Sequence, residues 1–369
     1  MTISVLIPDG ESEFALFVMH CLAPRHDVRI HVAGEARWPS TRLSRFCASY
    51  TRIPAKVDET SWLSIVSDIV RRRRIDVLLP VGPRGISATV RHREALASFV
   101  AVVPTPTAES LATADDKGRL ATFLDGAGIA TPPTLLVEVG PAFLAPAATM
   151  RYPVLVKPVF GWGGEGIERF ETAIDLWNAF ERRDPSTWSG AYVAQTVRVG
   201  PVIGINVLAI EGRLVAVTVQ RGVIPNSQPY AAASAIRFFR DAAVEALAER
   251  LVGALRWSGV ANVDTLRDDA TGELEVLDVN ARYWGSLRGS CVAGVSFPYL
   301  ACLAAMGIEF DRPEYDLCDY VHGKAALRAG LRQLLGRGGR LDVRRSGLAF
   351  LAADPLAEGS RVLVQQLLG

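Results

Sequence analysis

The chain has 369 residues, almost half of them hydrophobic, and its 40 basic and 39 acidic residues leave a formal net charge of +1. This length exceeds what one compact core usually holds and predicts two or three domains. The basic and acidic residues are spread along the chain and nearly balance, so nucleic acid is not expected as a partner. No stretch reaches the ~18 apolar residues that a membrane span needs, and the chain opens directly on a strand pattern, so we expect neither a membrane partner nor a targeting segment.

The cysteines and the one basic run carry no site. The five cysteines show no Cys-x-x-Cys spacing and no histidine at metal-ligand distance, which favours neither zinc nor disulfides and is typical of a cytoplasmic protein. Arginines fill residues 71–74, at the end of a stretch with helical apolar spacing. Cations are favoured at a helix C-terminus, so we interpret this run as a solvated helix end.

Residues 1–110 alternate between strand and helix patterns. Apolar strands are predicted at 3–7, 77–80 and 100–103, and a helix with Phe14, Val18 and Leu22 on one face follows the first of them. This alternation predicts a Rossmann-like α/β domain with a mostly parallel sheet.

Residues 111–188 predict a small α+β lobe. Asp115-Asp116-Lys117 opens a helix that ends near Gly126, and a Pro/Ala-rich connector is expected at 140–149. The remaining elements are the strands 154–157 and 167–170, joined by a glycine-rich loop, and a helix around 174–180.

Residues 189–310 predict a larger lobe, and residues 311–369 a tail that packs on the core. The lobe should contain antiparallel strands and a helix capped by Asp241, at residues 192–197, 203–210, 214–220, 241–257, 260–267 and 273–280. In the tail, an Arg-rich stretch with Leu327, Leu331, Leu334 and Leu335 predicts a packed or solvated helix in preference to a membrane anchor.

The strand pair around residue 270 places acidic residues opposite each other. Taking residues 270–272 as a three-residue turn pairs residue 269 with 273, and counting outward then sets Asp264 opposite Asp278. Two carboxylates at that separation repel unless a cation such as Mg²⁺ lies between them.

Alternation along the second strand sends Leu274, Val276, Asp278 and Asn280 to one face. Asp264, Asp278 and Asn280 are therefore the predicted metal ligands. The alternatives are a solvated polar strand end, or a slip of one residue that turns Asp264 away.

A glycine-rich loop lies between the two strands of the small lobe. Its glycines are Gly161, Gly163, Gly164 and Gly166. They match GxGxxG only formally, because a strand follows instead of a helix. A glycine loop between antiparallel strands predicts a flap whose N–H groups lie over phosphates, with Lys157 adding a positive charge. The alternative is a plain glycine hairpin with a solvated lysine.

These features occur in the order typical of the ATP-grasp superfamily, which the chain resembles over about residues 1–300. The matching elements are Asp116-Lys117 with the stretch 128–132, Lys157-Pro158, the glycine loop, the strand 192–197, and Asp278-Val-Asn280-Ala-Arg282. The resemblance implies a preATP-grasp domain followed by two lobes that clasp ATP and Mg²⁺, with Mn²⁺ as an alternative metal.

The resemblance also implies a role for each matching residue. Lys117 and Lys157 would hold phosphates under the flap glycines, and the hinge Gln195-Thr196-Val197 would bind adenine, with the backbone of the last two residues pairing with the base. The metal would be held by Asp264, Asp278 and Asn280. Lys157 and Arg282 would be catalytic, and Arg221, Arg282 and Ser286 would bind substrate.

Four features depart from the usual family pattern. Thr196 stands where relatives often carry Glu, and residues 201–203 lack the second acidic residue that often follows the next glycine. Asp278 stands where Glu is commoner, and Ala281 where Pro is usual. The acidic contact to the ribose is therefore unassigned, and either one or two metal ions could bind.

The activity implied by the resemblance is ATP-dependent carboxylate–amine ligation through an acyl phosphate, with release of ADP and phosphate. Its partners would be a small-molecule carboxylate and amine, and a homodimer is one expected assembly. Two alternatives within the fold are a regulatory protein that binds ATP without turnover and an ATP-dependent carboxylase. An NAD-dependent oxidoreductase is disfavoured because no glycine fingerprint follows the first strand.

Overall fold

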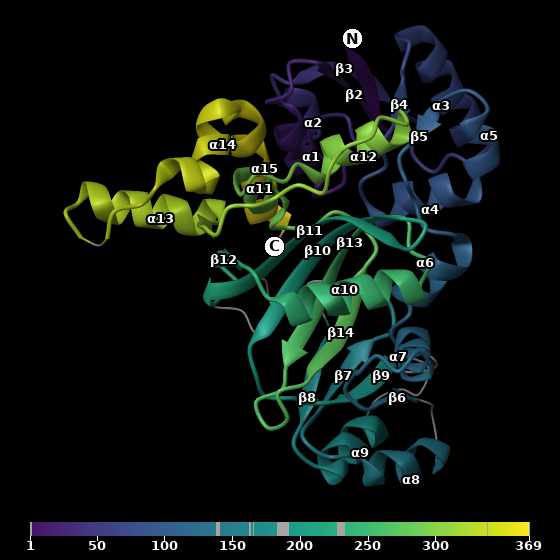
Figure 1. Ribbon diagram of the computed structural model, residues 1–369, viewed down its shortest axis with the longest axis vertical. Helices are drawn as coiled ribbons and strands as arrows, with labels where there is room; N and C mark the ends of the chain where they lie inside the picture. Colours follow the sequence, from purple (N-terminus) through teal and green to yellow (C-terminus); the bar gives the residue numbers. More distant parts are fainter. Residues whose placement is uncertain are drawn as a thin grey trace.

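The computed structural model describes residues 2–137, 141–161, 164, 166–182, 192–226, 233–337 and 339–368. These residues form a five-stranded, a four-stranded and a six-stranded sheet. Figure 1 shows the five-stranded sheet and its helices at the top, the six-stranded sheet in the middle and the four-stranded sheet at the bottom. The predicted class, an α/β domain followed by two lobes of mixed α and β structure, is confirmed.

The N-terminal sheet is parallel throughout, in the order β3-β2-β1-β4-β5. Its strands are β1 (Ile3–Ile7), β2 (Val28–Gly34), β3 (Cys47–Arg52), β4 (Val77–Leu78) and β5 (Ala101–Val102). Its helices are α1 (Ala15–Leu22), α2 (Ser40–Leu43), α3 (Glu59–Arg73), α4 (Pro83–Arg91) and α5 (Arg93–Ala97). The strand order reverses between β1 and β4, and ligands of such sheets bind beside the loops that leave this reversal.

The small lobe is built on the antiparallel order β6-β9-β7-β8. Its strands are β6 (Thr134–Val137), β7 (Val154–Pro158), β8 (Glu168–Phe170) and β9 (Tyr192–Thr196). The helices of this region are α6 (Ala108–Asp115), α7 (Lys117–Gly126), α8 (Pro141–Thr149) and α9 (Ala173–Glu181).

Two expectations for this region are corrected. The supposed connector contains helix α8, because Phe143 and Ala147 pack into the core of the lobe and so stabilise a helix there. Strand β9, which we grouped with the larger lobe, pairs with β6 and β7. A run of apolar strands in the sequence does not indicate which sheet each strand joins.

The large lobe has the sheet order β14-β13-β10-β11-β12-β15. Its strands are β10 (Val202–Ile210), β11 (Arg213–Ile224), β12 (Ala235–Phe239), β13 (Gly259–Arg267), β14 (Leu274–Asn280) and β15 (Asp319–Val321). As predicted, an amphipathic helix, α10 (Ala242–Ala254), is capped by Asp241 and buries Val244, Leu247 and Leu251 against one face. The opposite face meets the N-terminal domain, together with α11 (Leu287–Val292) and α12 (Phe297–Ala305).

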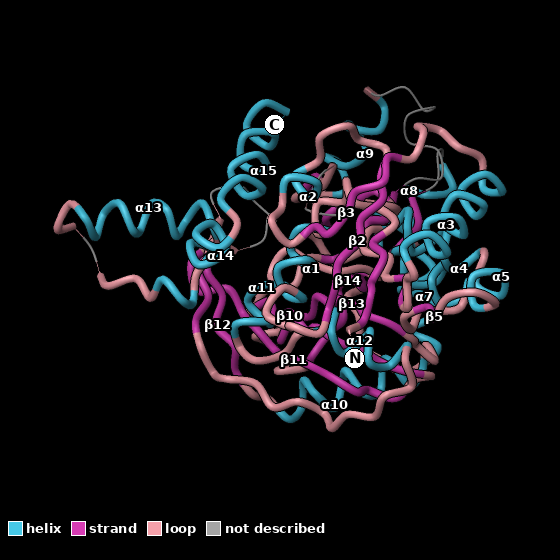
Figure 2. The backbone as a smooth tube through the Cα atoms, turned by 90° about the horizontal axis from the view of Figure 1, so that it is seen from above, coloured by secondary structure: helices cyan, strands magenta, loops and turns pink. Residues whose placement is uncertain are grey.

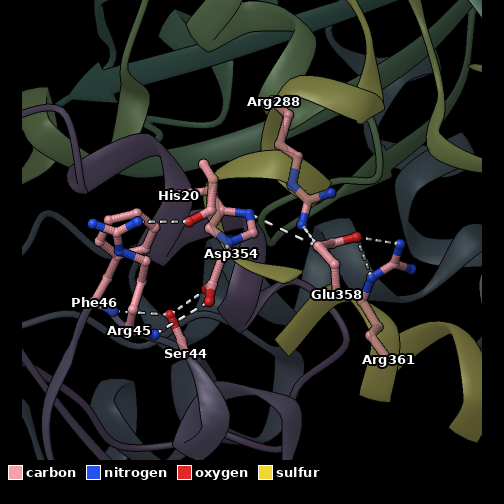
Figure 3. Close-up of polar contacts among 9 residues, drawn as sticks. His20, Ser44, Arg45, Phe46, Arg288, Asp354, Glu358 and Arg361 are labelled. Atoms are coloured by element: carbon pink, nitrogen blue, oxygen red, sulfur yellow. Dashed lines mark hydrogen bonds and ion pairs between the residues drawn. The ribbon is translucent and has the colours of Figure 1, made fainter. Parts of the chain in front are cut away.

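The predicted tail, residues 311–369, begins too early, because β15 lies within it and joins the large sheet beside β12. The rest of the tail consists of α13 (Gly323–Leu334), a 3₁₀ turn (Val343–Arg345), α14 (Gly347–Ala353) and α15 (Pro355–Leu368). A buried polar cluster attaches it to the rest of the protein (Figure 3). Asp354 accepts hydrogen bonds from His20 Nε2 at 3.1 Å and from Ser44 Oγ at 2.5 Å. Glu358 pairs with Arg288 of α11 and with Arg361. The tail therefore joins α1 of the N-terminal domain to the helix that follows strand β14.

In this cluster the pKa values of both His20 and Asp354 are lowered, the first by burial and the second by hydrogen bonding. Burial lowers the pKa of His20 below its ordinary 6.5, and the hydrogen bond to Asp354 opposes the shift. Burial raises the pKa of Asp354, but the hydrogen bonds from His20 and Ser44 outweigh it and leave that pKa below 3.8. The neutral histidine and the ionised carboxylate are thus the folded forms.

We expect His20→Leu to destabilise the protein by about 2 kcal/mol at pH 8, because leucine cannot donate a hydrogen bond to the buried Asp354. The difference from wild type should shrink as the pH falls below about 6.5, because the unfolded wild-type chain then gains a proton that folded His20 resists. Guanidinium unfolding followed by circular dichroism measures both effects. The exposed His26→Leu is the matched control, and a His20 effect that grows on acidification would contradict the assignment.

Candidate functional site

Two acidic side chains face each other on the edge strand of the large sheet and its neighbour. Asp264 of β13 pairs with Asp278 of β14, and Asn262 pairs with Asn280. The predicted pairing of the two carboxylates is confirmed. Asn280 also donates from Nδ2 to Asp264 Oδ2 at 3.3 Å, so three of these side chains converge.

The turn that joins the two strands, and the register next to it, differ from those predicted. Asp268 N–H donates to the Glu273 carbonyl at 2.9 Å, so the turn is one residue longer than expected. A β-bulge then leaves Leu277 as an extra residue on β14, between the Thr265–Val276 and Asp264–Asp278 pairs, and restores the register.

The bulge also corrects the predicted alternation on β14. Val276 and Val279 both lie in the core beneath α10, although three positions separate them. Asp278 and Asn280 consequently point to the opposite face from Val276, and Leu274 also packs against the core. An extra residue in a strand reverses the side-chain alternation beyond it, so a strict period of two fails here.

Two lysines of the small lobe approach the carboxylates. Lys117 Nζ lies 3.5 Å from Asp278 Oδ2 and donates to the Gly161 carbonyl at 2.9 Å. Its place is set by Asp116, whose side chain caps α7. Lys157 Nζ donates to Gln195 Oε1 at 2.6 Å, which links the flap strand to the hinge strand.

The charges of the site are only partly compensated. Burial, and then the neighbouring Asp278, raises the pKa of Asp264 to about 6. The same two causes raise the pKa of Asp115 to about 6. Burial lowers the pKa of Lys157, and Asp278 opposes that shift. A bound cation beside Asp264 and Asp278 would offset the repulsion from Asp278 that contributes to the two raised carboxyl pKa values.

The donor set fits a hard divalent cation that completes its shell from elsewhere. Among the described residues, no group of three His, Cys, Asp or Glu side chains is arranged as a metal site. The protein would thus offer two carboxylates, from Asp264 and Asp278, and the amide of Asn280. Mg²⁺ characteristically takes one or two carboxylates and fills its remaining positions with phosphate oxygens and water.

The glycine loop follows β7, which is antiparallel to β8, as expected of a flap. Gly161, Gly164 and Gly166 have φ of 149°, 82° and 71°, conformations that L side chains rarely adopt. A Cβ at Gly166 would also lie 2.9 Å from Pro158 Cγ. Gly163 lies outside the described residues. The backbone shape of the loop therefore requires glycine at the positions that can be described.

The hinge differs from the expectation for adenine. Thr196 N–H donates to the Pro133 carbonyl at 3.0 Å, and Val197 N–H donates to the Pro153 carbonyl at 2.9 Å. Neither N–H group can pair with a base while these bonds hold. The buried Thr196 hydroxyl has no hydrogen-bond partner among the described residues. Gln195 is fixed at both ends, since its Nε2 donates to Thr134 Oγ1 at 3.0 Å.

Arg282 lies where the N-terminal domain meets the large lobe. Its Nη2 donates to Asn280 Oδ1 at 3.1 Å, and its guanidinium lies 4.8 Å from the Phe14 ring centroid. Burial lowers the pKa of Arg282, with Glu13 as the strongest opposing charge. Sequence reasoning missed Glu13, although its place after β1, at the strand-order reversal, could have indicated it.

A polar row crosses the large sheet beside the carboxylates. Gly204 pairs with Asp264 on one side and with Gln220 on the other. Gln220 Nε2 donates to Ser286 Oγ at 2.6 Å, which brings Ser286 to this face. Gln220 was not predicted, although extending the register across β10 would have found it.

Arg221 is not brought to this row. It follows Gln220 on β11 and therefore points to the opposite face. Its guanidinium lies 5.5 Å from the Phe239 ring centroid. The structure gathers Arg282 and Ser286 beside the carboxylates but leaves Arg221 on the other side of the sheet.

The observed register predicts which cysteine pair can be cross-linked. The double change Asp264→Cys/Asp278→Cys should form a disulfide on mild oxidation, because opposed Cβ atoms lie near the range that a disulfide needs. Thr265→Cys/Asp278→Cys is the matched control and should remain reduced. Peptide mass spectrometry without reduction measures both, and cross-linking of the control pair alone would mean that the strand has slipped.

Comparisons with known proteins bear on the fold. Residues 198–319 match the protein family described as ATP-grasp in the biosynthetic pathway with Ter operon. No curated protein matches the sequence.

Solved structures match over most of the chain. Biotin carboxylase from Campylobacter jejuni has a TM-score of 0.65 and 18% identity, over 86% of this chain and 74% of its own. N5-carboxyaminoimidazole synthetase from Staphylococcus aureus has a TM-score of 0.65 and 15% identity, over 86% and 79%. L-amino acid ligase from Bacillus licheniformis has a TM-score of 0.58 and 18% identity, over 82% and 74%. The resemblance to the ATP-grasp superfamily is thus confirmed, and the chain has the ATP-grasp fold with an N-terminal α/β domain ahead of its two lobes.

Proposed function

We propose that this protein is an ATP-dependent ligase that phosphorylates a carboxylate and couples the resulting acyl phosphate to an amine. The observation that carries the proposal is the convergence of Lys117 from the small lobe on Asp278 of the large lobe, 3.5 Å apart. This arrangement offers positive charge for phosphates and negative charge for a metal at one place. Phosphoryl transfer depends mainly on such positioning and charge stabilisation.

Each charged residue of the site has a proposed role that follows from its charge and its position. Lys117 and Lys157 would hold ATP phosphates beneath the flap. Asp264, Asp278 and Asn280 would hold Mg²⁺, or Mn²⁺ in its place, and the metal would neutralise phosphate charge. Arg282, buried between the domains, would stabilise the transferred phosphoryl group and orient the carboxylate.

The relatives support ATP as the cosubstrate. The Campylobacter biotin carboxylase structure is a βγ-ATP complex, and the Staphylococcus synthetase structure contains ADP. A further relative, from Hydrogenobacter thermophilus, contains MgADP and bicarbonate. In these proteins the same fold accommodates the ligands that the lysines and carboxylates would hold here.

A carboxylase is the second candidate, because two of the compared proteins are named for carboxylation or carboxyamino products. Bicarbonate would then take the place of the organic carboxylate at Arg282, and ADP release with bicarbonate as the sole acid would favour this reading. A regulatory protein without turnover is disfavoured, since Lys117, Lys157 and Arg282 are all in place around the acidic pair.

Asp278→Asn should lower the rate of ATP turnover about a hundredfold or more at ordinary Mg²⁺, because it removes one anionic ligand. The thermal midpoint should change little, because Asp278 is a partly exposed carboxylate beside another. The exposed Asp269→Asn, in the turn of the same strand pair, is the matched control. Full turnover in the Asp278 variant would remove this residue from the mechanism.

The reaction type can be read from the phosphorus products. We expect ADP and phosphate, formed only when a carboxylate and an amine are both present, and slow hydrolysis without them because the closed flap excludes water. Oxygen-18 in the carboxylate should appear in the released phosphate, since the C–O bond of the acyl phosphate breaks when the amine attacks. Label in AMP would instead mean adenylation.

A further inference from the structure

Helix α13 presents a row of leucines that the described part of the chain leaves uncovered. The four side chains are 44, 60, 85 and 63% exposed, in the order Leu327, Leu331, Leu334 and Leu335. At about 100° per residue they occupy roughly 100° of the helix circumference, so they form one face. Figure 2 shows α13 projecting away from the body of the protein.

The inner side of α13 is made of small residues. Ala326 is fully buried, and a Cβ added at Gly330 would lie 3.3 Å from Leu348 Cδ1 of α14. The helix therefore already uses Ala326 and Gly330 for packing within the chain. The leucine face points elsewhere and is available to a partner.

A basic stripe runs beside the leucine face. Residues 323–341 contain five basic side chains and no acidic one. Three of them, Lys324, Arg328 and Arg332, are spaced by four residues and so lie along one line next to the leucines. In the part of the chain that the structure describes, none of these three forms an ion pair.

Charge selects among the partners that could cover this face. A second copy of the chain would bring the same five positive charges against the first, which opposes pairing through α13. An anionic lipid surface complements the stripe, while its acyl boundary accepts the leucines. No helix among the described residues is both long and apolar enough to cross a membrane, and α13 has only 12 residues, which suits contact at the surface alone.

We propose that α13 docks on an anionic lipid surface, with its leucine face in the acyl boundary and Lys324, Arg328 and Arg332 at the headgroups. This proposal differs from the sequence-based expectation of no membrane partner. That expectation rested on the lack of a membrane-spanning segment and on a tail helix that is packed or solvated. The inference is independent of the reaction proposed above, because it rests on residues of the tail alone.

Vesicle sedimentation with the full chain tests the proposal. The protein should bind vesicles of phosphatidylcholine that contain about one third phosphatidylglycerol, should not bind phosphatidylcholine alone, and should dissociate as salt is raised. Leu331→Gln/Leu334→Gln should weaken binding by about tenfold or more. Arg328→Gln/Arg332→Gln should weaken it by about 25-fold, at roughly fivefold for each charge.

Matched variants at other exposed positions distinguish binding through α13 from non-specific hydrophobic or electrostatic binding to the vesicles. Ile174→Gln changes an apolar side chain on α9 that is 71% exposed, and Arg71→Gln/Arg73→Gln changes the basic run on α3. Both should bind vesicles like wild type. The proposal is overturned if wild type ignores anionic vesicles, if the controls lose as much as the α13 variants, or if light scattering shows a dimer that the leucine variant dissociates.

Discussion

The opposition of Asp264 and Asp278 on neighbouring strands is the constraint on which the rest of the site depends. Burial is the main cause of the raised pKa of Asp264, and repulsion from Asp278, its partner across the strands, adds to it. Lys117, Lys157 and Arg282 surround the pair from different parts of the chain, and Lys117 forms an ion pair with Asp278. A site that keeps both signs of charge only partly compensated suits ligands that carry both signs, such as a metal ion with phosphates.

The fold holds these charges together through contacts far from them. The N-terminal domain packs on the face of the large sheet that carries the acidic pair, which sets Phe14 and Glu13 against Arg282. The buried cluster of His20, Asp354 and Glu358 fastens the tail to both α1 and α11. Because α11 begins just after Ser286, the same cluster steadies the loop that carries Arg282 and Ser286.

The bulge on β14 explains why the predicted pairing of Asp264 with Asp278 is correct although the predicted turn length and side-chain alternation are not. The sequence predicted a short turn and strict alternation, and the real strand has a longer turn and one extra residue. The longer turn and the extra residue shift the register in opposite directions, so Asp278, beyond the bulge, keeps its predicted partner. Val276 lies between the turn and the bulge, and it packs in the core instead of on the predicted face. A bulge satisfies two demands at once, since it keeps valines in the core on both sides of itself and still turns Asp278 toward the site.

The sequence by itself determined the elements that depend on neighbouring residues. It located the parallel N-terminal domain, the cap of α7, the glycine flap and the acidic strand pair, because periodicity, capping and turn residues act over a few positions. Only the tertiary structure decided that β9 joins the small sheet. It also decided that Gln220 and Ser286 lie on the face of the acidic pair and Arg221 on the opposite face. The hydrogen bonds that the hinge N–H groups make to backbone carbonyls are likewise a result of the fold. It also left the leucines of α13 uncovered. These outcomes depend on which distant segments pack together, and burial between distant segments has no signature in the local order of residues.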